Sequence, residues 1–414
     1  MKRREFLAAS TTAPALLFAR TGEGREAAGN QAGFLKEHGF WDYTTPGAGG
    51  MESFRQEDYL ALLDDMAGAG MNSLMIYVKW LTTGYRSRLP FQDQSPDHPV
   101  IASGNSLLQR TIEEAGQRGI KVWLGGAVTY FDISRFGADP YRTYTRLSGF
   151  DLPVEVGLYD TDTPGITERI VQIYEELVEL FPGAGGLQVE LEGAGVENPR
   201  RIPLYDRWAR ENGRPPFAEL GHPFNPRSFD VPDWRDYTTD SRLRVLRSVE
   251  KAVRAKGFRG DLSTICETGS SPYALGQAVN LKLFHRRFPD WVATTYEYDK
   301  WNHRYGMMDL CIDHPKREGL QVFYLPRGVM TWGSRWPLPI PLDRSWRMDL
   351  EDIRRFKPRG VWWFGSGGRN EGAHVSLARL RKSGYAGGAE ARRALLELVS
   401  DLRPGDAGHA ATRK

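Results

Sequence analysis

The segment Gly185-Gly186-Leu187-Gln188-Val189-Glu190-Leu191-Glu192-Gly193 combines a strand pattern with two acidic side chains. Side chains alternate between the two faces of a strand, so the apolar residues share one face while Gln188, Glu190 and Glu192 share the other. Ionised carboxylates are rarely buried unless they have a partner or a chemical role. We therefore expect a buried strand that ends in an acid/base site. The alternative is an ion pair that stiffens the strand end.

Short apolar runs alternate with amphipathic stretches on both sides of this segment. Strands are predicted over residues 38–43, 72–78, 121–127, 187–192, 261–266, 291–298, 319–325 and 360–364. Helices are predicted over residues 56–68, 106–118, 163–180, 241–256, 273–287, 305–316, 344–356 and 389–402. Eight strand–helix units in chain order indicate an α/β fold with a parallel sheet and crossover helices. We expect a (β/α)8 TIM barrel with long βα loops.

The alternative architecture is an open, doubly wound sheet. Such a sheet requires a glycine-rich phosphate turn of the form G-x-G-x-x-G after an early strand. Neither Gly125-Gly126 nor Gly365-Ser366-Gly367-Gly368 matches that pattern. The barrel is therefore the favoured architecture.

The chain begins with Met1-Lys2-Arg3-Arg4-Glu5-Phe6-Leu7 and continues through an apolar stretch to Ala19. Its Arg3-Arg4-x-Phe6-Leu7 pattern resembles a twin-arginine export signal. The apolar run is shorter than the ~20 residues that a membrane span needs. We expect residues 1–30 to be a cleaved signal, residues 31–404 to form the barrel with an insertion at 193–239, and residues 405–414 to be a disordered tail. The mature protein would be periplasmic or extracellular in a bacterium; the alternative is a frayed cytosolic N-terminus.

Composition narrows the classes of partner. The 414 residues are 40% hydrophobic and 26% charged, which is typical of a globular protein with a substantial core. The 55 basic and 52 acidic side chains nearly balance, so the charge does not favour nucleic acid as a partner. No membrane association is expected after the signal is removed. The sequence leaves open whether Cys266 and Cys311 pair.

The carboxyl ends of the strands form the active-site mouth of such a barrel. We expect Glu192, Glu297 and Glu190 to be the catalytic residues there. The expected substrate-binding residues are Asp42, Lys79, Trp80, Tyr130, Glu267, Asp299, Tyr324, Arg327, Trp332, Trp362 and Trp363. Glycoside hydrolysis needs this combination, because one carboxylic acid protonates the leaving oxygen while a second group attacks or activates the attacker. Aromatic faces would hold the sugar ring.

No metal or cofactor is expected. Carboxylates without clustered histidines are poor zinc ligands, and His38, His303 and His374 are isolated in the sequence. The chain also lacks a serine nucleophile elbow, a P-loop and a kinase signature.

These features resemble the (β/α)8 glycoside hydrolases over about residues 36–370. The segment 185–192 resembles the fourth strand of chitinase-type enzymes, in which acidic residues alternate and the last Glu is the acid. Tyr296-Glu297-Tyr298-Asp299 is similar to their strand-six Tyr-Asp, and Gly360-Val361-Trp362-Trp363 resembles their eighth strand, whose Trp lies under the sugar. The chain departs from that family at Glu190, where the family has Asp, and at Gln188, which replaces a further Asp. This weakens the case for substrate-assisted chemistry.

A second likeness concerns residues 204–213, which resemble the helix after the acid in β-galactosidase-like barrels. Those enzymes carry an Asn-Glu pair on strand four and a nucleophilic Glu at the end of strand seven. Here Leu191 precedes Glu192, and residues 324–327 contain no Glu. The residues therefore indicate the (β/α)8 glycoside hydrolase superfamily, and they match neither the chitinase-type nor the β-galactosidase-like family outright.

We expect an exported glycoside hydrolase with Glu192 as the acid/base. Glu190 would lie deeper and favour protonated Glu192 by like-charge repulsion. Glu297 is the expected nucleophile or base, with Asp299 and then Glu267 as rivals. Lys79, Arg327 and Arg335 indicate an anionic group on an oligosaccharide, polysaccharide or glycoside substrate, unless they pair with the protein's own carboxylates. The alternative functions are a non-catalytic carbohydrate-binding barrel and a sugar isomerase or epimerase.

Overall fold

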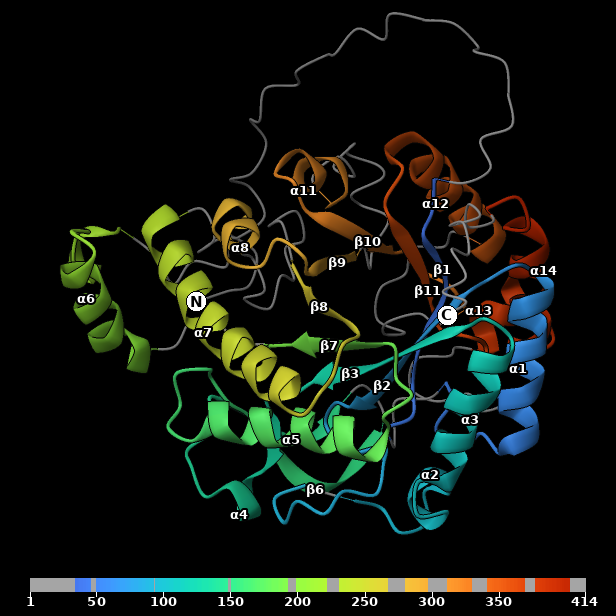
Figure 1. Ribbon diagram of the computed structural model, residues 1–414, viewed down its shortest axis with the longest axis horizontal. Coiled ribbons are helices and arrows are strands. Elements are labelled where there is room, and N and C mark those ends of the chain that lie inside the picture. Colours follow the sequence, from blue (N-terminus) through green and yellow to red (C-terminus); the bar gives the residue numbers. More distant parts are fainter. Residues whose placement is uncertain are drawn as a thin grey trace, which may run out of the picture. The chain divides into compact units, whose positions relative to one another are not determined.

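Eight parallel strands close into a barrel in the computed structural model, which describes residues 34–45, 50–92, 94–147, 150–192, 199–221, 231–266, 280–296, 311–329, 341–368 and 377–402. The barrel strands are β1 (Glu37–Tyr43), β2 (Ser73–Lys79), β3 (Lys121–Ala127), β7 (Gly186–Glu190), β8 (Asp261–Ile265), β9 (Val292–Tyr296), β10 (Gln321–Leu325) and β11 (Gly360–Phe364). Pairing of β1 with β11 closes the ring. The expected (β/α)8 TIM barrel is therefore confirmed (Figure 1).

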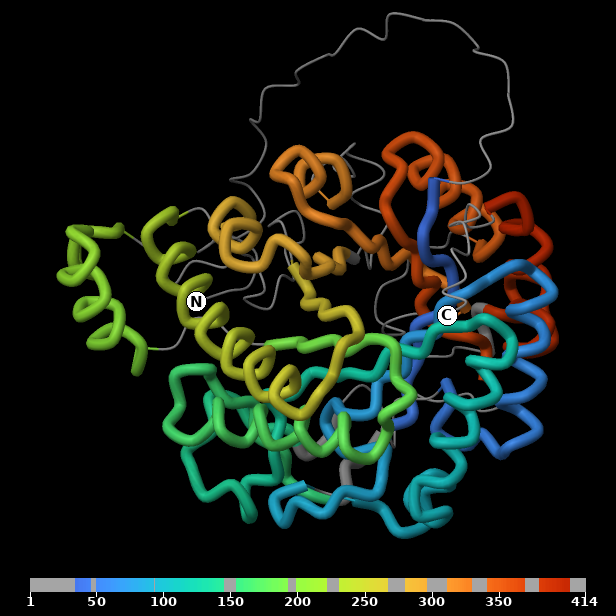
Figure 2. Tube along the Cα trace, in the orientation of Figure 1, coloured from blue at the N-terminus to red at the C-terminus, as the bar shows by residue number. Residues whose placement is uncertain are grey.

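Helices cover the outside of the barrel (Figure 1). Those that follow the barrel strands are α1 (Gln56–Gly68), α3 (Ser106–Gln117), α5 (Ile166–Leu180), α7 (Pro232–Ala255), α8 (Leu281–Arg287), α11 (Asp313–Arg317), α12 (Leu342–Phe356) and α14 (Gly388–Leu398). Shorter helices occur at α2 (Pro99–Ala102), α4 (Ile133–Phe136) and α13 (Leu377–Lys382). In Figure 2 the blue α1 lies between α3 and the red α14, and it contacts both. The first and last parts of the barrel are thus joined through the helices as well as through the strands.

Aromatic side chains fill the base of the barrel, at the amino ends of its strands. The ring centroids of Trp123, Phe323 and Trp362 lie 4.8–5.9 Å apart. Trp123 fits because β7 carries Gly186 opposite it, where a Cβ would lie 2.2 Å from the indole. Below this layer, the Glu37 carboxylate accepts hydrogen bonds from Lys121 and from the Trp123 indole, both at 2.7 Å. The base is therefore packed shut.

Two connections contain structure beyond the eight predicted strand–helix units. The connection between β3 and α5 forms a separate antiparallel sheet from β4 (Tyr130–Asp132), β5 (Arg142–Leu147) and β6 (Phe150–Leu158), in the order β4-β6-β5. The insertion after β7 contains η1 (Pro199–Arg201), α6 (Ile202–Glu211) and η2 (Phe217–Glu219). α7 starts at Pro232, nine residues before the predicted start at 241, and its first turns join α6 in a small aromatic core with Tyr205, Trp234 and Tyr237.

None of the helices in the described ranges is both long and apolar enough to cross a bilayer. Residues 1–30 and 405–414, for which a signal and a tail are expected, lie outside the described residues.

Candidate functional site

The two predicted carboxylates lie at the carboxyl end of β7. Glu190 is the last residue of the strand and is only 5% exposed, whereas Glu192 follows it and is partly exposed. The alternation predicted for this segment is present, since Leu187, Val189 and Leu191 are fully buried on the opposite face. Close approach of β3 to β7 depends on Gly125, because a Cβ there would lie 2.3 Å from the Gln188 carbonyl oxygen. The local sequence thus brings β7 and its carboxylates against the neighbouring strand.

Hydroxyl and indole donors surround the two carboxylates. The Tyr77 hydroxyl at the end of β2 donates a hydrogen bond to Oε2 of Glu190. The Trp80 indole donates to Oε2 of Glu192 at 3.3 Å, and the Tyr130 hydroxyl also bonds the Glu192 side chain. Thr129 donates its hydroxyl to the Glu192 carbonyl at 2.6 Å. Both the side chain and the backbone of Glu192 are therefore held by residues from two other strand ends.

Tyr43 completes this cluster at the end of β1. Its ring centroid lies 5.1 Å from that of Tyr77 and 5.6 Å from that of Trp80. Burial, together with the charges of Glu190, Glu192 and Asp42, raises the pKa of Tyr43 well above its usual value. Burial and the charge of Glu192 raise the pKa of Tyr130 in the same way. Both phenols therefore stay protonated, and the Tyr130 hydroxyl is a hydrogen-bond donor to Glu192.

The sequence places Tyr77 at the carboxyl end of its strand, but Tyr43 was not among the expected residues of the mouth. Tyr43 is the last residue of β1 and pairs in register with Tyr77, which lies two residues before the end of β2. Period-two alternation carried to the last residue of β1 would have placed Tyr43 in the mouth as well.

The predicted cations Lys79 and Arg327 are buried. The ammonium group of Lys79 donates to the Trp80 carbonyl oxygen at 2.7 Å and lies 5.9 Å from the Phe131 ring centroid. Arg327 follows β10 and pairs with Phe364 in a short parallel bridge. The ammonium group of Lys79 thus contacts a backbone carbonyl and an aromatic ring, whereas the alternative stated from the sequence was pairing with a carboxylate.

Four predicted substrate-binding residues do not reach the mouth, so their assignment is corrected. Trp362 lies in the aromatic layer at the base of the barrel and donates to Ser73 at 2.9 Å. Trp363 is fully buried and donates to Nε2 of His38 at 2.9 Å. The Tyr324 hydroxyl faces α12, where it donates to Asp349 at 3.2 Å. Asp42 is fully buried and accepts the backbone N–H of Ser366 at 2.7 Å.

The structural role of Asp42 explains its burial. Besides Ser366, it accepts the backbone N–H of Tyr43 at 2.7 Å, and Gly50 approaches so closely that a Cβ there would lie 1.8 Å from its Oδ1. Burial raises the pKa of Asp42 to about 6, although the hydrogen bonds from Ser366 and Tyr43 act in the opposite direction. His38 is likewise a core residue, because burial lowers its pKa to about 4.

Several residues predicted for the site lie outside the described residues, namely Glu267, Glu297, Asp299, Trp332 and Arg335; the isolated His303 and His374 lie outside them too. Cys266 is a buried free thiol, so it does not pair with Cys311, and burial raises its pKa to about 12. Within the described ranges, no three His, Cys, Asp or Glu side chains converge as metal ligands.

The described part of the mouth therefore contains two carboxylates at different depths with distinct partners. Glu190 lies below and is held by Tyr77, while Glu192 lies nearer the surface and is oriented by Trp80 and Tyr130. Such an arrangement allows one carboxyl group to exchange a proton with a bound molecule while the other supplies fixed negative charge.

Comparison with known proteins gives similarity at the level of the fold. No family model and no curated protein matches the chain. The catalytic domain of a β-amylase from Paenibacillus polymyxa is similar over 90% of this chain and 100% of its own, with a TM-score of 0.55 and 11% identity. A β-galactosidase from the psychrophilic Marinomonas ef1 is similar over 88% of this chain and 59% of its own, with a TM-score of 0.54 and 14% identity.

An endo-1,4-β-D-mannanase from Thermotoga petrophila is similar over 89% of this chain and 100% of its own, with a TM-score of 0.51 and 11% identity. At these identities the similarity shows the fold alone. The predicted resemblance to the (β/α)8 glycoside hydrolases is confirmed at that level: the chain has the barrel fold found in these glycoside hydrolases.

Proposed function

We propose that this protein is a glycoside hydrolase that cleaves an O-glycosidic bond with Glu192 as the acid/base. The observation that carries the proposal is the pair of carboxylates at the end of β7, held by donors from neighbouring strand ends. The barrel fold shared with a β-amylase, a mannanase and a β-galactosidase supports it by analogy. The substrate class is an oligosaccharide, a polysaccharide or a glycoside.

Glu192 suits the role of proton donor because it is partly exposed at the mouth. Its protonated form would deliver the proton to the glycosidic oxygen as the bond to the anomeric carbon breaks. The Trp80 indole and the Tyr130 hydroxyl fix the rotamer of its side chain. Because Trp80 is only 3% exposed, its role is to orient Glu192 rather than to stack on a sugar ring.

Glu190 is better suited to an electrostatic role than to attack. It is nearly buried, and the Tyr77 hydroxyl occupies one of its oxygens. Its negative charge beside Glu192 favours the protonated form of that residue, and it also stabilises positive charge that develops on a sugar ring. We propose Glu297 as the carboxylate that attacks or activates water, with Asp299 and Glu267 as alternatives; these residues follow β9 and β8 in the sequence.

We also propose that the protein is exported. The twin-arginine pattern in residues 1–30 supports this proposal, and the proposed location is the periplasm or the outside of a bacterial cell.

The test is hydrolysis of a panel of aryl glycosides and aryl uronides by wild type, Glu192→Gln and the control Glu113→Gln. Glu113 is exposed on α3, away from the mouth. A missing general acid slows substrates with poor leaving groups most, because dinitrophenolate departs without a proton. Glu192→Gln should therefore lose at least ~100-fold in kcat on phenyl glycosides and much less on dinitrophenyl glycosides. Equal turnover by Glu192→Gln and wild type on every accepted substrate would refute the assignment.

The second candidate is a carbohydrate-binding barrel without turnover. The Trp80 and Tyr130 donors hold the Glu192 carboxyl group in one orientation, in which it could accept hydrogen bonds from sugar hydroxyls without transferring a proton. Sugar binding seen by calorimetry with no hydrolysis of any panel member would establish this function instead.

A further inference from the structure

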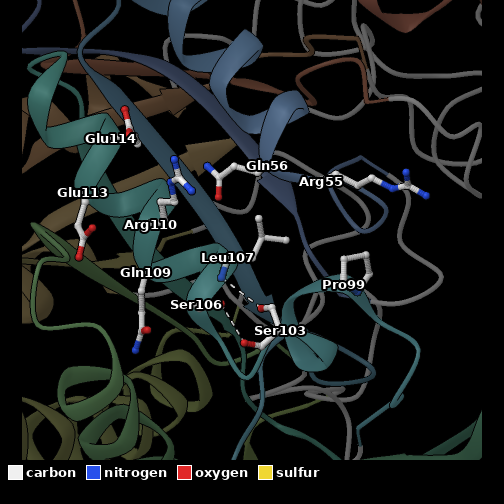
Figure 3. Close-up of a pocket in the computed structure, with 10 residues that line it drawn as sticks. All are labelled: Arg55, Gln56, Pro99, Ser103, Ser106, Leu107, Gln109, Arg110, Glu113 and Glu114. Carbon is white, nitrogen blue, oxygen red and sulfur yellow. Dashed lines mark hydrogen bonds between the residues drawn. The ribbon is translucent and has the colours of Figure 1, made fainter.

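Among the described residues, two surface grooves outside the barrel differ in charge. The first, between α1 and α3, encloses about 660 Å³. Figure 3 shows that it contains Arg55 and Arg110 together with Glu113 and Glu114, so its charges balance. Glu114 is also paired with Arg118 at 2.7 Å. This groove shows no preference for a charged ligand.

The second, which we call the outer groove, lies between α6, α7 and α8 and encloses about 550 Å³. α7 contacts both α6 and α8 (Figure 1). Its walls include Trp208 from α6, Asp236 and Asp240 from α7, and Lys282, Arg286 and Arg287 from α8. The groove is thus built from the segments that follow β7 and β8.

The acidic side chains of the outer groove are already neutralised. Arg214 lies 3.8 Å from Asp236, and Asn280 donates to the same carboxylate at 2.7 Å. Arg244 pairs with Asp240 at 2.7 Å. These carboxylates therefore contribute little negative potential to a ligand in the groove.

The cations of α8 are arranged differently. Lys282, Arg286 and Arg287 are all exposed. Across the ranges that the structure describes, no carboxylate lies within ion-pairing distance of any of the three. Their positions one helical turn apart place Lys282 and Arg286 on the same face. The groove therefore presents uncompensated positive charge.

An aromatic side chain borders this charge. Trp208 is half-buried, and its ring centroid lies 5.8 Å from those of Tyr205 and Tyr237, which fix it against the small aromatic core. The remaining accessible part of the indole lines the groove. An apolar ring edge beside guanidinium groups suits a ligand that has apolar ring faces and anionic substituents.

We propose that the outer groove binds an acidic polysaccharide, whose carboxylate or sulfate groups contact Lys282, Arg286 and Arg287 while a sugar ring packs on Trp208. The sugar nature of the ligand rests on the proposed function. The helices that follow barrel strands start at the mouth end, so α8 and the first turns of α7 place the groove at the same end as Glu192. The near balance of 55 basic and 52 acidic residues disfavours nucleic acid, which needs a broad positive field.

The test is affinity electrophoresis of the full chain in gels that contain polygalacturonate, a sulfated polysaccharide or neutral dextran. Wild type should be retarded by the acidic polymers and not by dextran, and added salt should weaken the effect. Arg286→Glu/Arg287→Glu should bind at least about tenfold more weakly, because two attractive contacts become repulsive. Arg381→Glu/Lys382→Glu on α13 changes the net charge equally at exposed positions and should bind like wild type.

Two results would overturn the proposal: equal affinities for the two double variants, or binding of a single-stranded oligodeoxynucleotide as tight as that of polygalacturonate. Glu192→Gln separates the groove from the catalytic proposal, because it should retain wild-type retardation. Retardation that depends on Arg286 and Arg287, without hydrolysis of any glycoside, would support the groove and reject the hydrolase. Hydrolysis without retardation would support the hydrolase and reject the groove as a binding site.

Discussion

Replacing Arg201 by Met should destabilise the protein through the carboxylates that it leaves behind. Arg201 is 1% exposed, and its guanidinium lies 3.4 Å from Asp160 and 2.9 Å from Asp162. It also lies 4.7 Å from the Tyr237 ring centroid. This arrangement ties the loop before α5 to the start of α6 and to α7. Met fills a similar volume but provides no charge and no donors.

The expected loss in the free energy of unfolding depends on the hydrogen bonds and ion pairs that each carboxylate keeps without Arg201. Removing one partner of a buried ion pair costs about 3–5 kcal/mol, because the other charge remains buried. Asp162 keeps hydrogen bonds from Tyr237 and Ser241, both at 2.7 Å, and an ion pair with Arg244 at 3.2 Å. We therefore expect a loss at the lower end of that range, about 3 kcal/mol in the free energy of unfolding at pH 7.

The loss should also depend on pH. Burial by itself raises the pKa of Asp162, but Arg201 and the hydrogen bonds from Ser241 and Tyr237 outweigh it and lower the pKa below the usual value. A carboxylate with a depressed pKa stabilises the fold above its unfolded pKa, and that stabilisation is lost as the pH falls through the folded pKa. The difference between wild type and Arg201→Met should be full above about pH 5 and should shrink below about pH 4.

Urea unfolding followed by tryptophan fluorescence measures this difference. The control is Arg200→Met, whose pair with Asp139 at 3.4 Å is exposed and should contribute less than about 1 kcal/mol. In the Asp160→Asn background, Arg201→Met should cost at least about 1 kcal/mol less, because one buried charge is gone. A cost below about 1 kcal/mol in the wild-type background, or an unchanged cost in the Asp160→Asn background, would show that the network does not act as described.

Three further predictions concern other parts of the barrel. Asp42→Asn should flatten the pH dependence of stability. Because the pKa of Asp42 is raised to about 6, the wild-type free energy of unfolding should fall by up to about 3 kcal/mol as the pH rises from 4 to 6. Melting temperatures measured across that range should show this loss in wild type and not in the variant. Trp362→Ala should lower the free energy of unfolding by about 3–5 kcal/mol and leave KM unchanged, since the indole lies in the aromatic layer at the base of the barrel. A raised KM with unaltered stability would instead show that Trp362 binds the sugar. Tyr77→Phe should lower kcat by about tenfold because the buried Glu190 loses a donor, and kinetics equal to those of wild type would contradict the assigned position of Glu190.

Hydrophobic periodicity was sufficient to predict the barrel, because each strand is a short apolar run bounded by turn residues. β3 and β11 were predicted with the bounds that the structure shows, and α1 likewise. The start of α7 was misplaced, since Pro232 at its first turn is a helix-start signal that the apolar pattern after 241 obscured. The sheet of β4, β5 and β6 was missed because local pairing within a connection leaves a weaker pattern than a barrel strand does.

The candidate site was harder to predict, because sequence does not give depth along the barrel axis. Trp362 pairs in register with Gly39, and Gly39 with Ser73, so it lies at the level of the amino ends of the strands. Tyr43 pairs with Tyr77, four residues further along both strands, at the level of the mouth. Strand stagger decides this difference, and it is fixed only by pairing around the closed ring. The positions of Glu190 and Glu192 at the mouth could be predicted because Glu190 ends its strand and Glu192 follows it by two residues.

The pairing of β1 with β11 also constrains how the chain reaches its folded state. It joins Glu37 to Gly360, and the bond between Trp363 and His38 spans 325 positions in the sequence. Contacts of such long range form slowly, because the chain must lose the entropy of closing a very large loop before these contacts stabilise it. A chain that stops before β11 would keep the edges of β1 and β10 open, and open edges pair with other chains. Synthesis must therefore be nearly complete before this protein can protect itself from aggregation.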